Sequence, residues 1–242
     1  DLCIRLGGRM TSDGGMELLK PKPDGGWRLF LCIPMEDLLV TFPVDFDQTG
    51  DTLYMTDSRG RDTAALVAVE MASGERRFLV EDARADVAGV LIHPTAKNVQ
   101  AAAFTYERKE WRILDPAIAE DWAYLRTVAD GDIEVVSRTL DDRYWIVAYL
   151  LDDGPLRYYR YHRDRHQAEF LFSDRWALEG LPLARMHPVI IESRDGLKLV
   201  SYYTLPLSSD SDGDGRPDHP LPMVLYVHGG PWGRDIWGYN AI

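Results

Sequence analysis

The chain has 242 residues, of which 45% are hydrophobic and 27% are charged. These proportions are ordinary for a globular protein and exclude disordered, collagen-like and coiled-coil chains. Because 39 acidic residues exceed 27 basic ones, the formal net charge is −12, which disfavours binding to nucleic-acid phosphates.

The first residues lack the features of a secretory signal. Residues 1–8 carry neither a basic start nor an apolar centre, so we expect that the natural N-terminus is missing. No run reaches the roughly 18 apolar residues that a membrane-spanning helix needs, so no membrane span is expected. Cys3 and Cys32 are compatible with one disulfide, but free, buried thiols are the favoured interpretation.

Short predicted strands recur through the first three quarters of the chain. A hairpin is expected at 16–21 and 27–33 around the turn PDGG. Three later units each place a polar turn before an aromatic and β-branched run, which is the local signature of a strand after a turn. The turns lie at 44–51, 92–97 and 138–143, and the strands that follow lie at 52–55, 99–104 and 144–149. Further strands are predicted at 65–69, 77–80 and 156–161.

This repeat has a period of about 46 residues with several short strands in each unit, which is typical of β-propeller blades. An ordinary β-sandwich also has short strands at regular spacing, but the period favours blades. Three blades and part of a fourth do not close a ring. Residues 1–185 are therefore predicted to form an incomplete β-propeller, which makes the fold mainly β.

A short helix is expected to interrupt the middle unit at 115–129. Apolar residues recur near helical spacing at Ile118, Trp122, Leu125 and Val128. Asp115 is predicted to cap the start, Pro116 suits the first helical position, and Gly131 fits the stop. The apolar stripe is expected to pack against the blade rather than to bind a ligand.

Residues 158–166 mix aromatic and basic side chains, a pattern that also occurs in nucleic-acid binders. The strand alternation and the acidic net charge favour a blade strand and its turn instead. No nucleic-acid partner is expected.

The pattern changes near residue 186. Strands predicted at 187–192 and 197–205 flank a turn at 193–196. The run at 222–227 is continuously apolar, as a strand buried on both faces of a mostly parallel sheet should be. Residues 186–242 are therefore predicted to be the start of a second domain, of α/β class.

An acidic loop lies between these predicted strands. Asp210, Asp212, Asp214 and Asp218 stand at positions 1, 3, 5 and 9 of a calcium-loop pattern, with glycine at position 6. Position 12 is Leu221 rather than the usual bidentate glutamate, and no flanking helix pair is evident. A solvated hairpin loop is the simpler interpretation, and Ca²⁺ is the only cofactor that the sequence suggests.

The apolar run at 222–227 ends in the motif HGGPW at 228–232. Glycines let the backbone turn sharply and approach a ligand. In α/β-hydrolases a turn of the HGGG type after this strand donates a backbone N–H to the oxyanion hole. Gly230 is therefore predicted to be an oxyanion donor and Gly229 the residue that makes the turn; a plain structural turn is the alternative.

The repeat together with the segments SRDGLKLVSYYTLP and LPMVLYVHGGPWGRDIWGYN resembles the prolyl oligopeptidase family of serine peptidases. The resemblance is strongest to the acylaminoacyl-peptidase and dipeptidyl-aminopeptidase branch. It covers nearly the whole chain, including DDGPLRYYRYHRD. It implies an N-terminal β-propeller over a C-terminal α/β-hydrolase domain, with the propeller restricting access to short peptides.

The same resemblance implies a catalytic Ser, Asp and His. These are expected beyond Ile242, because no G-x-S-x-G elbow occurs in the chain. Tyr239 lies near the position at which prolyl oligopeptidase uses a tyrosine hydroxyl as an oxyanion donor, whereas His228 is expected to brace the turn and not to act as the general base. The chain is therefore expected to be a fragment that is inactive alone.

Two classes of function are left open by the sequence. The first is part of a serine peptidase that cleaves short peptides by acyl transfer, and the second is a non-catalytic propeller that binds proteins or peptides. An esterase with a β-rich accessory domain is a third, weaker interpretation. The preference for acyl-blocked, dipeptidyl or prolyl substrates and the oligomeric state are undetermined, and a periplasmic or secreted bacterial location is favoured over a cytoplasmic one.

Overall fold

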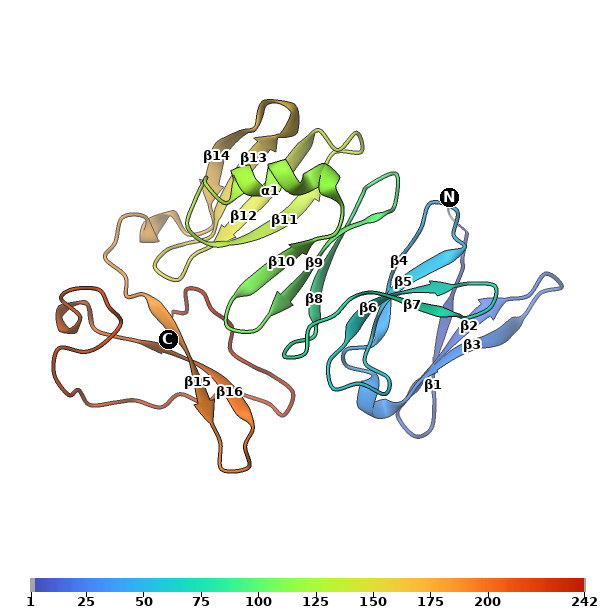
Figure 1. Cartoon of the computed structure of the whole chain (residues 1–242), viewed down its shortest axis with the longest axis horizontal. Coiled ribbons are helices and arrows are strands. Elements are labelled where there is room, and N and C mark those ends of the chain that lie inside the picture. The colour runs from blue at the N-terminus through green and yellow to red at the C-terminus, as the bar shows by residue number, and fades with distance from the viewer. Residues whose placement is uncertain (1–2, 242) are drawn as a thin grey trace. The chain divides into compact units, whose positions relative to one another are not determined.

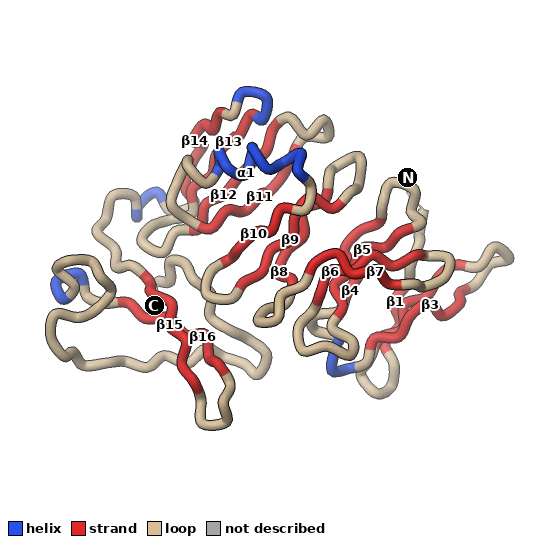
Figure 2. The backbone as a smooth tube through the Cα atoms, viewed as in Figure 1, coloured by secondary structure: helices blue, strands red, loops and turns tan. Residues whose placement is uncertain are grey.

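The computed structural model describes residues 3–241, and strands dominate this part of the chain (Figures 1 and 2). The chain divides into two compact units. The first comprises the residues up to 104 together with 111–116, and the second comprises 105–110 and the residues from 117 onward. The sheets are antiparallel meanders, in which strands that follow one another in the sequence pair side by side. The prediction of a mainly β fold is confirmed.

The first unit begins with a three-stranded sheet and continues with a four-stranded one. The three strands are β1 (Gly7–Met10), β2 (Met16–Pro21) and β3 (Trp27–Ile33). A 3-10 turn at Met35–Asp37 leads into β4 (Phe42–Phe46), β5 (Thr52–Asp57), β6 (Ala65–Glu70) and β7 (Arg76–Val80). The predicted hairpin and the predicted strands at 52–55, 65–69 and 77–80 all form.

The core of the four-stranded sheet lies on its two central strands. Leu53 and Met55 of β5 and Val67 and Val69 of β6 have no exposed surface. Burying one such side chain stabilises the fold by about 1.5–3 kcal/mol. The central strands are therefore apolar because each is paired on both sides and covered, whereas β7 at the edge carries two exposed arginines.

The polar turn before β5 is built on one carboxylate. Asp47 Oδ1 accepts hydrogen bonds from the backbone N–H groups of Gly50, at 2.8 Å, and Thr52, at 3.1 Å. Gly50 has a φ of 80°, a conformation that glycine adopts without strain. The local sequence is therefore sufficient to close this turn and to start the strand that follows.

A third sheet follows in the order β10-β9-β8. Its strands are β8 (Val87–Ile92), β9 (Val99–Thr105) and β10 (Lys109–Ile113). Ala101, Ala102 and Ala103 of β9 are fully buried. The predicted turn at 92–97 and strand at 99–104 are confirmed. Residues 105–110, which contain the β9–β10 turn, belong to the second unit.

The second unit contains one α-helix among the described residues and a four-stranded meander. A 3-10 turn at Pro116–Ile118 precedes α1 (Ala119–Leu125). The strands are β11 (Asp132–Arg138), β12 (Tyr144–Leu150), β13 (Arg157–His162) and β14 (Gln167–Ser173). Short 3-10 turns follow β13 at Arg163–Arg165 and β14 at Trp176–Leu178.

The predicted helix forms, but its ends were placed wrongly. The N-cap is Ile118, without a side-chain cap, and Asp115 instead accepts a hydrogen bond from the Asn98 side chain at 2.7 Å. The helix ends at Leu125 rather than near Gly131. The 3-10 turn at Pro116–Ile118 moves the start of α1 to Ala119, and the backbone leaves the helix after Leu125 in a turn at 126–128. The predicted packing role of the stripe is confirmed at Ile118, Trp122 and Leu125, which are buried.

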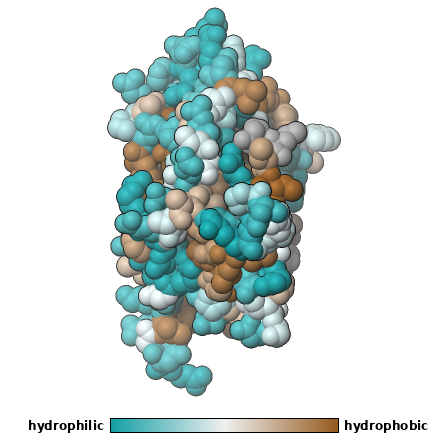
Figure 3. Space-filling view, turned by 90° about the vertical axis from the view of Figure 1, so that its right-hand side faces the viewer, coloured by the Kyte–Doolittle hydropathy of each residue, from teal (hydrophilic) through white to brown (hydrophobic). Residues whose placement is uncertain are grey.

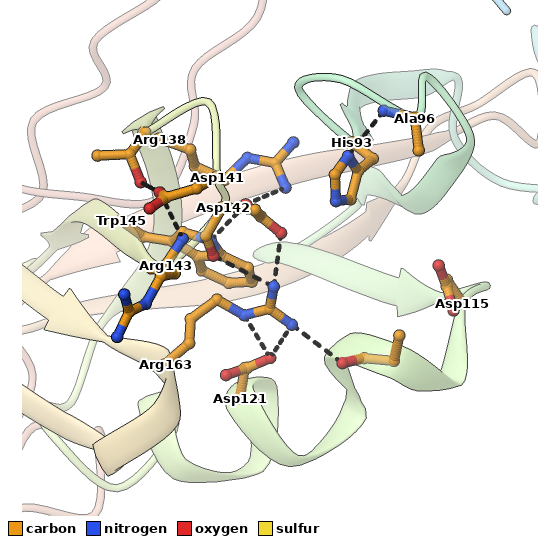
Figure 4. A network of polar contacts seen from close by, with 12 residues as sticks. His93, Ala96, Asp115, Asp121, Arg138, Asp141, Asp142, Arg143, Trp145 and Arg163 are labelled. Atoms are coloured by element: carbon orange, nitrogen blue, oxygen red, sulfur yellow. Dashed lines mark hydrogen bonds and ion pairs between the residues drawn. The ribbon is translucent and has the colours of Figure 1, made fainter. Parts of the chain in front are cut away.

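A buried ionic network fastens α1 to the meander (Figure 4). Arg163 donates to Asp121 of α1 from Nε at 3.0 Å and from Nη2 at 2.8 Å, and to Asp142 from Nη1 at 2.6 Å. The carboxylates also accept hydrogen bonds from the Tyr161 hydroxyl and the Trp145 indole N–H, each at 2.8 Å. Both negative charges are thereby paired, which buried carboxylates require.

The last regular element of the second unit is a two-stranded hairpin. It pairs β15 (Met186–Glu192) with β16 (Lys198–Thr204), as predicted, and a 3-10 turn follows at Leu207–Ser209. The four residues from Ser193 to Gly196 close the hairpin through a 3.0 Å bond from the Gly196 N–H to the Ser193 carbonyl. The predicted domain boundary near residue 186 stays a prediction.

The strand predicted at 222–227 does not form in the described structure. Met223, Val224 and Leu225 are 85, 92 and 79% exposed, and no strand pairs with this segment among residues 3–241. The expectation of a strand buried on both faces is wrong for this structure. A parallel-type strand acquires its geometry from neighbours on both sides, and within 3–241 this segment has none.

The surface of the described part of the chain mixes hydrophilic and hydrophobic groups (Figure 3). Cys3 and Cys32 do not form a disulfide with each other, as favoured, but both are exposed and not buried. Cys32 lies on β3, whose alternation sends its neighbour Ile33 into the core and turns the thiol outward. α1 is the one α-helix within residues 3–241, and its 7 residues are too few to span a bilayer.

Candidate functional site

The HGGPW motif lies in an exposed, irregular segment of the second unit. Gly229 and Gly230 are both exposed, and a Cβ on Gly229 would meet no atom within 4 Å. A Cβ on Gly230 would lie 3.8 Å from the Trp232 backbone nitrogen, which is ordinary contact. The backbone of the two predicted oxyanion glycines is therefore open to the approach of a substrate.

Two residues shape the turn around these glycines: His228 precedes them and Gly233 follows them. His228 Nδ1 lies 2.7 Å from the Gly229 carbonyl oxygen, and its expected role of bracing the turn stays a prediction. A Cβ on Gly233 would lie 3.1 Å from the same oxygen, so Gly233 permits the close approach. Sequence reasoning missed Gly233, although its place two residues after Pro231 in a glycine-rich motif was a usable signal.

The segment after the motif is anchored, in contrast to the motif itself. Arg234 donates hydrogen bonds to the carbonyl oxygens of Thr105, at 2.9 Å, and Tyr106, at 2.6 Å. It also contacts the Tyr202 hydroxyl at 3.2 Å, and this hydroxyl donates to the Glu107 carbonyl at 2.7 Å. The β9–β10 turn therefore holds the residues that follow HGGPW through backbone carbonyls.

A second anchor is centred on Trp237, which is only 5% exposed. Its indole N–H donates to the Met186 carbonyl at 2.9 Å, and the Arg108 guanidinium lies 3.7 Å from the centroid of its ring. Arg108 in turn donates to Asp132 from Nε and pairs with it through Nη2, each at 2.8 Å. Sequence reasoning missed Trp237, Arg108 and Asp132, because nothing in their spacing shows that they meet.

The Asp132 carboxylate in this anchor is nearly buried. It also accepts a hydrogen bond from the Lys109 backbone N–H at 3.0 Å. Burial raises the pKa of Asp132 above its ordinary value, and the bonds from Lys109 and Arg108 offset only part of that rise. The paired guanidinium is what keeps a charged carboxylate acceptable at this position.

Tyr239 is fixed by its backbone. Its N–H donates to the Leu151 carbonyl at 2.7 Å, and its ring lies under the Arg175 guanidinium, 5.8 Å from the ring centroid. The side chain is half-buried. Its role as an oxyanion donor stays a prediction, because the contact with Arg175 accounts for the ring without any catalytic role.

The acidic loop brings together the first three of its predicted ligands. Oxygens of Asp210, Asp212 and Asp214 lie within 4.8 Å of one another. Asp210 Oδ2 accepts the Gly215 N–H at 3.1 Å, whereas Asp210 Oδ1 is buried and has no hydrogen-bond partner. Asp218 instead accepts a hydrogen bond from the Ser211 hydroxyl at 3.1 Å. Three hard oxygen donors fit the preference of Ca²⁺ in type, but Ca²⁺ takes 6–8 oxygen ligands.

Comparison with known proteins gives two relatives along the whole chain. Dipeptidyl aminopeptidase BIII of Pseudoxanthomonas mexicana is 50% identical over 241 residues, which cover 100% of this chain and 35% of that protein. Dipeptidyl peptidase family member 6 of Caenorhabditis elegans is 29% identical over 266 residues and is covered to 36%. The chain thus spans about a third of the length of these curated relatives. No family model matches it.

Solved structures agree with this at the level of the fold. A dipeptidyl aminopeptidase IV of Bacteroides ovatus superimposes with a TM-score of 0.64 at 13% identity, covering 97% of this chain and 36% of that one. A puromycin-hydrolyzing peptidase of Mycobacterium tuberculosis gives a TM-score of 0.51 at 13% identity over 80% of this chain and 30% of that one. The resemblance expected from the sequence is confirmed by these findings together.

Proposed function

We propose that this chain, which resembles the prolyl oligopeptidase family of peptidases along its whole length, is part of a member of that family. In this proposal it contributes propeller blades and the oxyanion turn to a serine peptidase that removes dipeptides from short peptides. The observation that carries the proposal is the 50% identity to a dipeptidyl aminopeptidase along the whole chain. The consecutive antiparallel meanders support blades. Peptidase relatives make the non-catalytic binding module the less supported alternative.

The chemistry assigned to this chain is the stabilisation of negative charge. A serine alkoxide attacks the scissile carbonyl, a histidine moves the proton, and an aspartate orients the histidine. The open Gly230 N–H would then donate to the carbonyl oxygen as it becomes an oxyanion. One such donor is commonly worth a factor of about 10²–10³ in kcat.

The proposal is tested with a fluorophosphonate probe and a dipeptidyl-p-nitroanilide substrate. The full-length protein encoded by the gene should be labelled at a serine and should release p-nitroaniline. The 242-residue chain should do neither, since it has no G-x-S-x-G elbow. Absence of labelling and of hydrolysis in the full-length protein would overturn the proposal, and labelling of the 242-residue chain would overturn its assignment of the nucleophile.

A matched pair of variants in the full-length protein tests the oxyanion role. Gly230→Pro removes the N–H, whereas Gly230→Ala keeps it and places its Cβ 3.8 Å from the Trp232 backbone nitrogen, in ordinary contact. We expect kcat to fall by roughly 10²–10³ in the proline variant and by much less in the alanine variant. Equal losses in the two variants would mean that the position matters for its shape and not for its donor.

A further inference from the structure

Within the segment from Gly229 to Tyr239, the first residues are exposed to solvent and the later ones are buried or bonded to other segments. Trp232 is 77% exposed, whereas Trp237 is 5% exposed and its neighbour Gly238 is buried. Arg234 is the first residue after the motif that is bonded to other segments of the described chain. Four residues of extended chain reach at most about 14 Å, so Arg234 limits how far Gly230 can move.

The hold on Trp237 combines three interactions with different requirements. The indole N–H needs the Met186 carbonyl, the ring needs the flat face of the Arg108 guanidinium, and that guanidinium is oriented by Asp132. A planar guanidinium satisfies a carboxylate at its edge and an aromatic ring on its face at once, which a lysine ammonium does not. Arg108 is therefore specified by geometry and not by charge alone.

We propose that Arg108 is a positioning residue: with Asp132 it clamps Trp237 and thereby keeps the Gly229–Gly230 backbone in the place where it can meet a developing oxyanion. This inference rests on the proposed function. The contacts of Arg108 are with Trp237 and Asp132, so in this proposal it acts through the backbone between Gly230 and Trp237. Because small displacements of a preorganised donor are costly, loosening the clamp should slow the chemical step more than it weakens substrate binding.

The test uses the full-length protein and the variant Arg108→Met, which keeps an apolar stem and removes the guanidinium. Amide hydrogen exchange of residues 229–239 should become at least several-fold faster than in the wild type, and kcat should fall by about 10-fold or more with little change in KM. Arg108→Lys should restore little of either. Trp237→Phe, which keeps a ring but removes the indole N–H, should give an intermediate effect.

Arg112→Met is the matched control, because the Arg112 guanidinium lies 4.4 Å from the Phe104 ring centroid in the first unit. It removes the same kind of contact and should leave exchange at 229–239 unchanged. Unchanged exchange in Arg108→Met would overturn the inference, and so would faster exchange with unaltered kcat in an active enzyme. If the wild type proves inactive, the proposed function and the positioning role fail, while the exchange rates still report whether the clamp itself exists.

Discussion

At the scale of single residues, Asp57 is a fully buried carboxylate of the first unit, and such a group needs charge partners. Its side chain has no exposed surface. It accepts hydrogen bonds from Arg59 Nε and Nη2, each at 2.8 Å, and from Arg76 Nη1 at 2.6 Å. Burial by itself would raise the pKa of Asp57, but the bonds from Arg59 and Arg76 together outweigh it, so the pKa lies below its ordinary value.

The lowered pKa sets the sign of a pH dependence. An aspartate in the unfolded chain has a pKa of about 3.9, and the folded form holds the ionised carboxylate more strongly. The stabilisation is therefore fully present above about pH 4 and is lost as the pH falls through the lower folded pKa. Acid should thus weaken the four-stranded sheet of β4 to β7 through this residue.

Replacing Asp57 by asparagine should be strongly destabilising. The variant Asp57→Asn leaves two guanidinium groups without their charge partner, and breaking a buried pair in this way costs about 3–5 kcal/mol at neutral pH. The measurement is urea denaturation at several pH values, and the difference from the wild type should shrink below about pH 4. The control is Glu81→Gln, whose exposed pair with Arg61 should be worth less than about 1 kcal/mol; a similar loss in both variants would contradict the argument.

At the scale of elements, the β11–β14 meander with α1 contrasts with the acidic loop at 210–218 in how each is held in place. The β11–β14 meander is one continuous sheet, and α1 is fastened to it by Arg163 and the two carboxylates that this arginine bridges. The acidic loop is fastened at its base by the Asp218 N–H, which donates to the Ser209 carbonyl at 2.7 Å. Its three clustered carboxylates repel one another unless a cation or water separates them.

The calcium interpretation of this loop stays a prediction and has a direct test. Ca²⁺ that binds only the folded protein stabilises it by RT ln(1 + [Ca²⁺]/Kd), about 2.7 kcal/mol at 100 times the Kd. Millimolar Ca²⁺ should therefore raise the Tm of the wild type, and Asp212→Asn should abolish the rise. Calorimetric titration gives the stoichiometry. If the Tm does not respond to Ca²⁺, or responds equally in the variant, the calcium interpretation is wrong and the segment is a solvated loop.

At the scale of the whole molecule, the chain is a succession of local meanders in which strands pair with their neighbours in sequence. The predicted strand of 222–227 is the exception, and it stays open in the described residues. This chain covers 35% of the bacterial relative, so the proposed activity belongs to the full-length protein and is measured there.

Substrate class is a property of the full protein. The proposed removal of dipeptides from short peptides favours substrates with a free N-terminal amine over acyl-blocked ones. The full-length protein should therefore cleave a dipeptidyl-p-nitroanilide about 10- to 100-fold faster, in kcat/KM, than its N-acetylated form, because a site built for an amine leaves polar groups unpaired when the amine is blocked. A preference for the N-acetylated substrate would instead support the acylaminoacyl alternative.

Local chemistry allowed the sequence by itself to determine the hairpins of this protein. Polar turns such as the one around Asp47 and Gly50 close within a few residues, and the aromatic and β-branched runs after them have one way to pair. The apolar stripe of α1 was also readable, and so was the HGGPW motif. These features depend on residues that are neighbours in the chain, so the sequence alone is enough to predict them.

Tertiary structure alone decided the features that need distant partners. The start of α1 depended on the preceding 3-10 turn. Whether 222–227 becomes a strand depended on neighbouring strands, and none pairs with this segment within 3–241. The clamp on Trp237 joins Arg108, Asp132 and Met186, which no spacing connects. Contacts of this kind are decided by which surfaces meet after the local elements have formed, because packing and the pairing of buried charges act between elements and not along the chain.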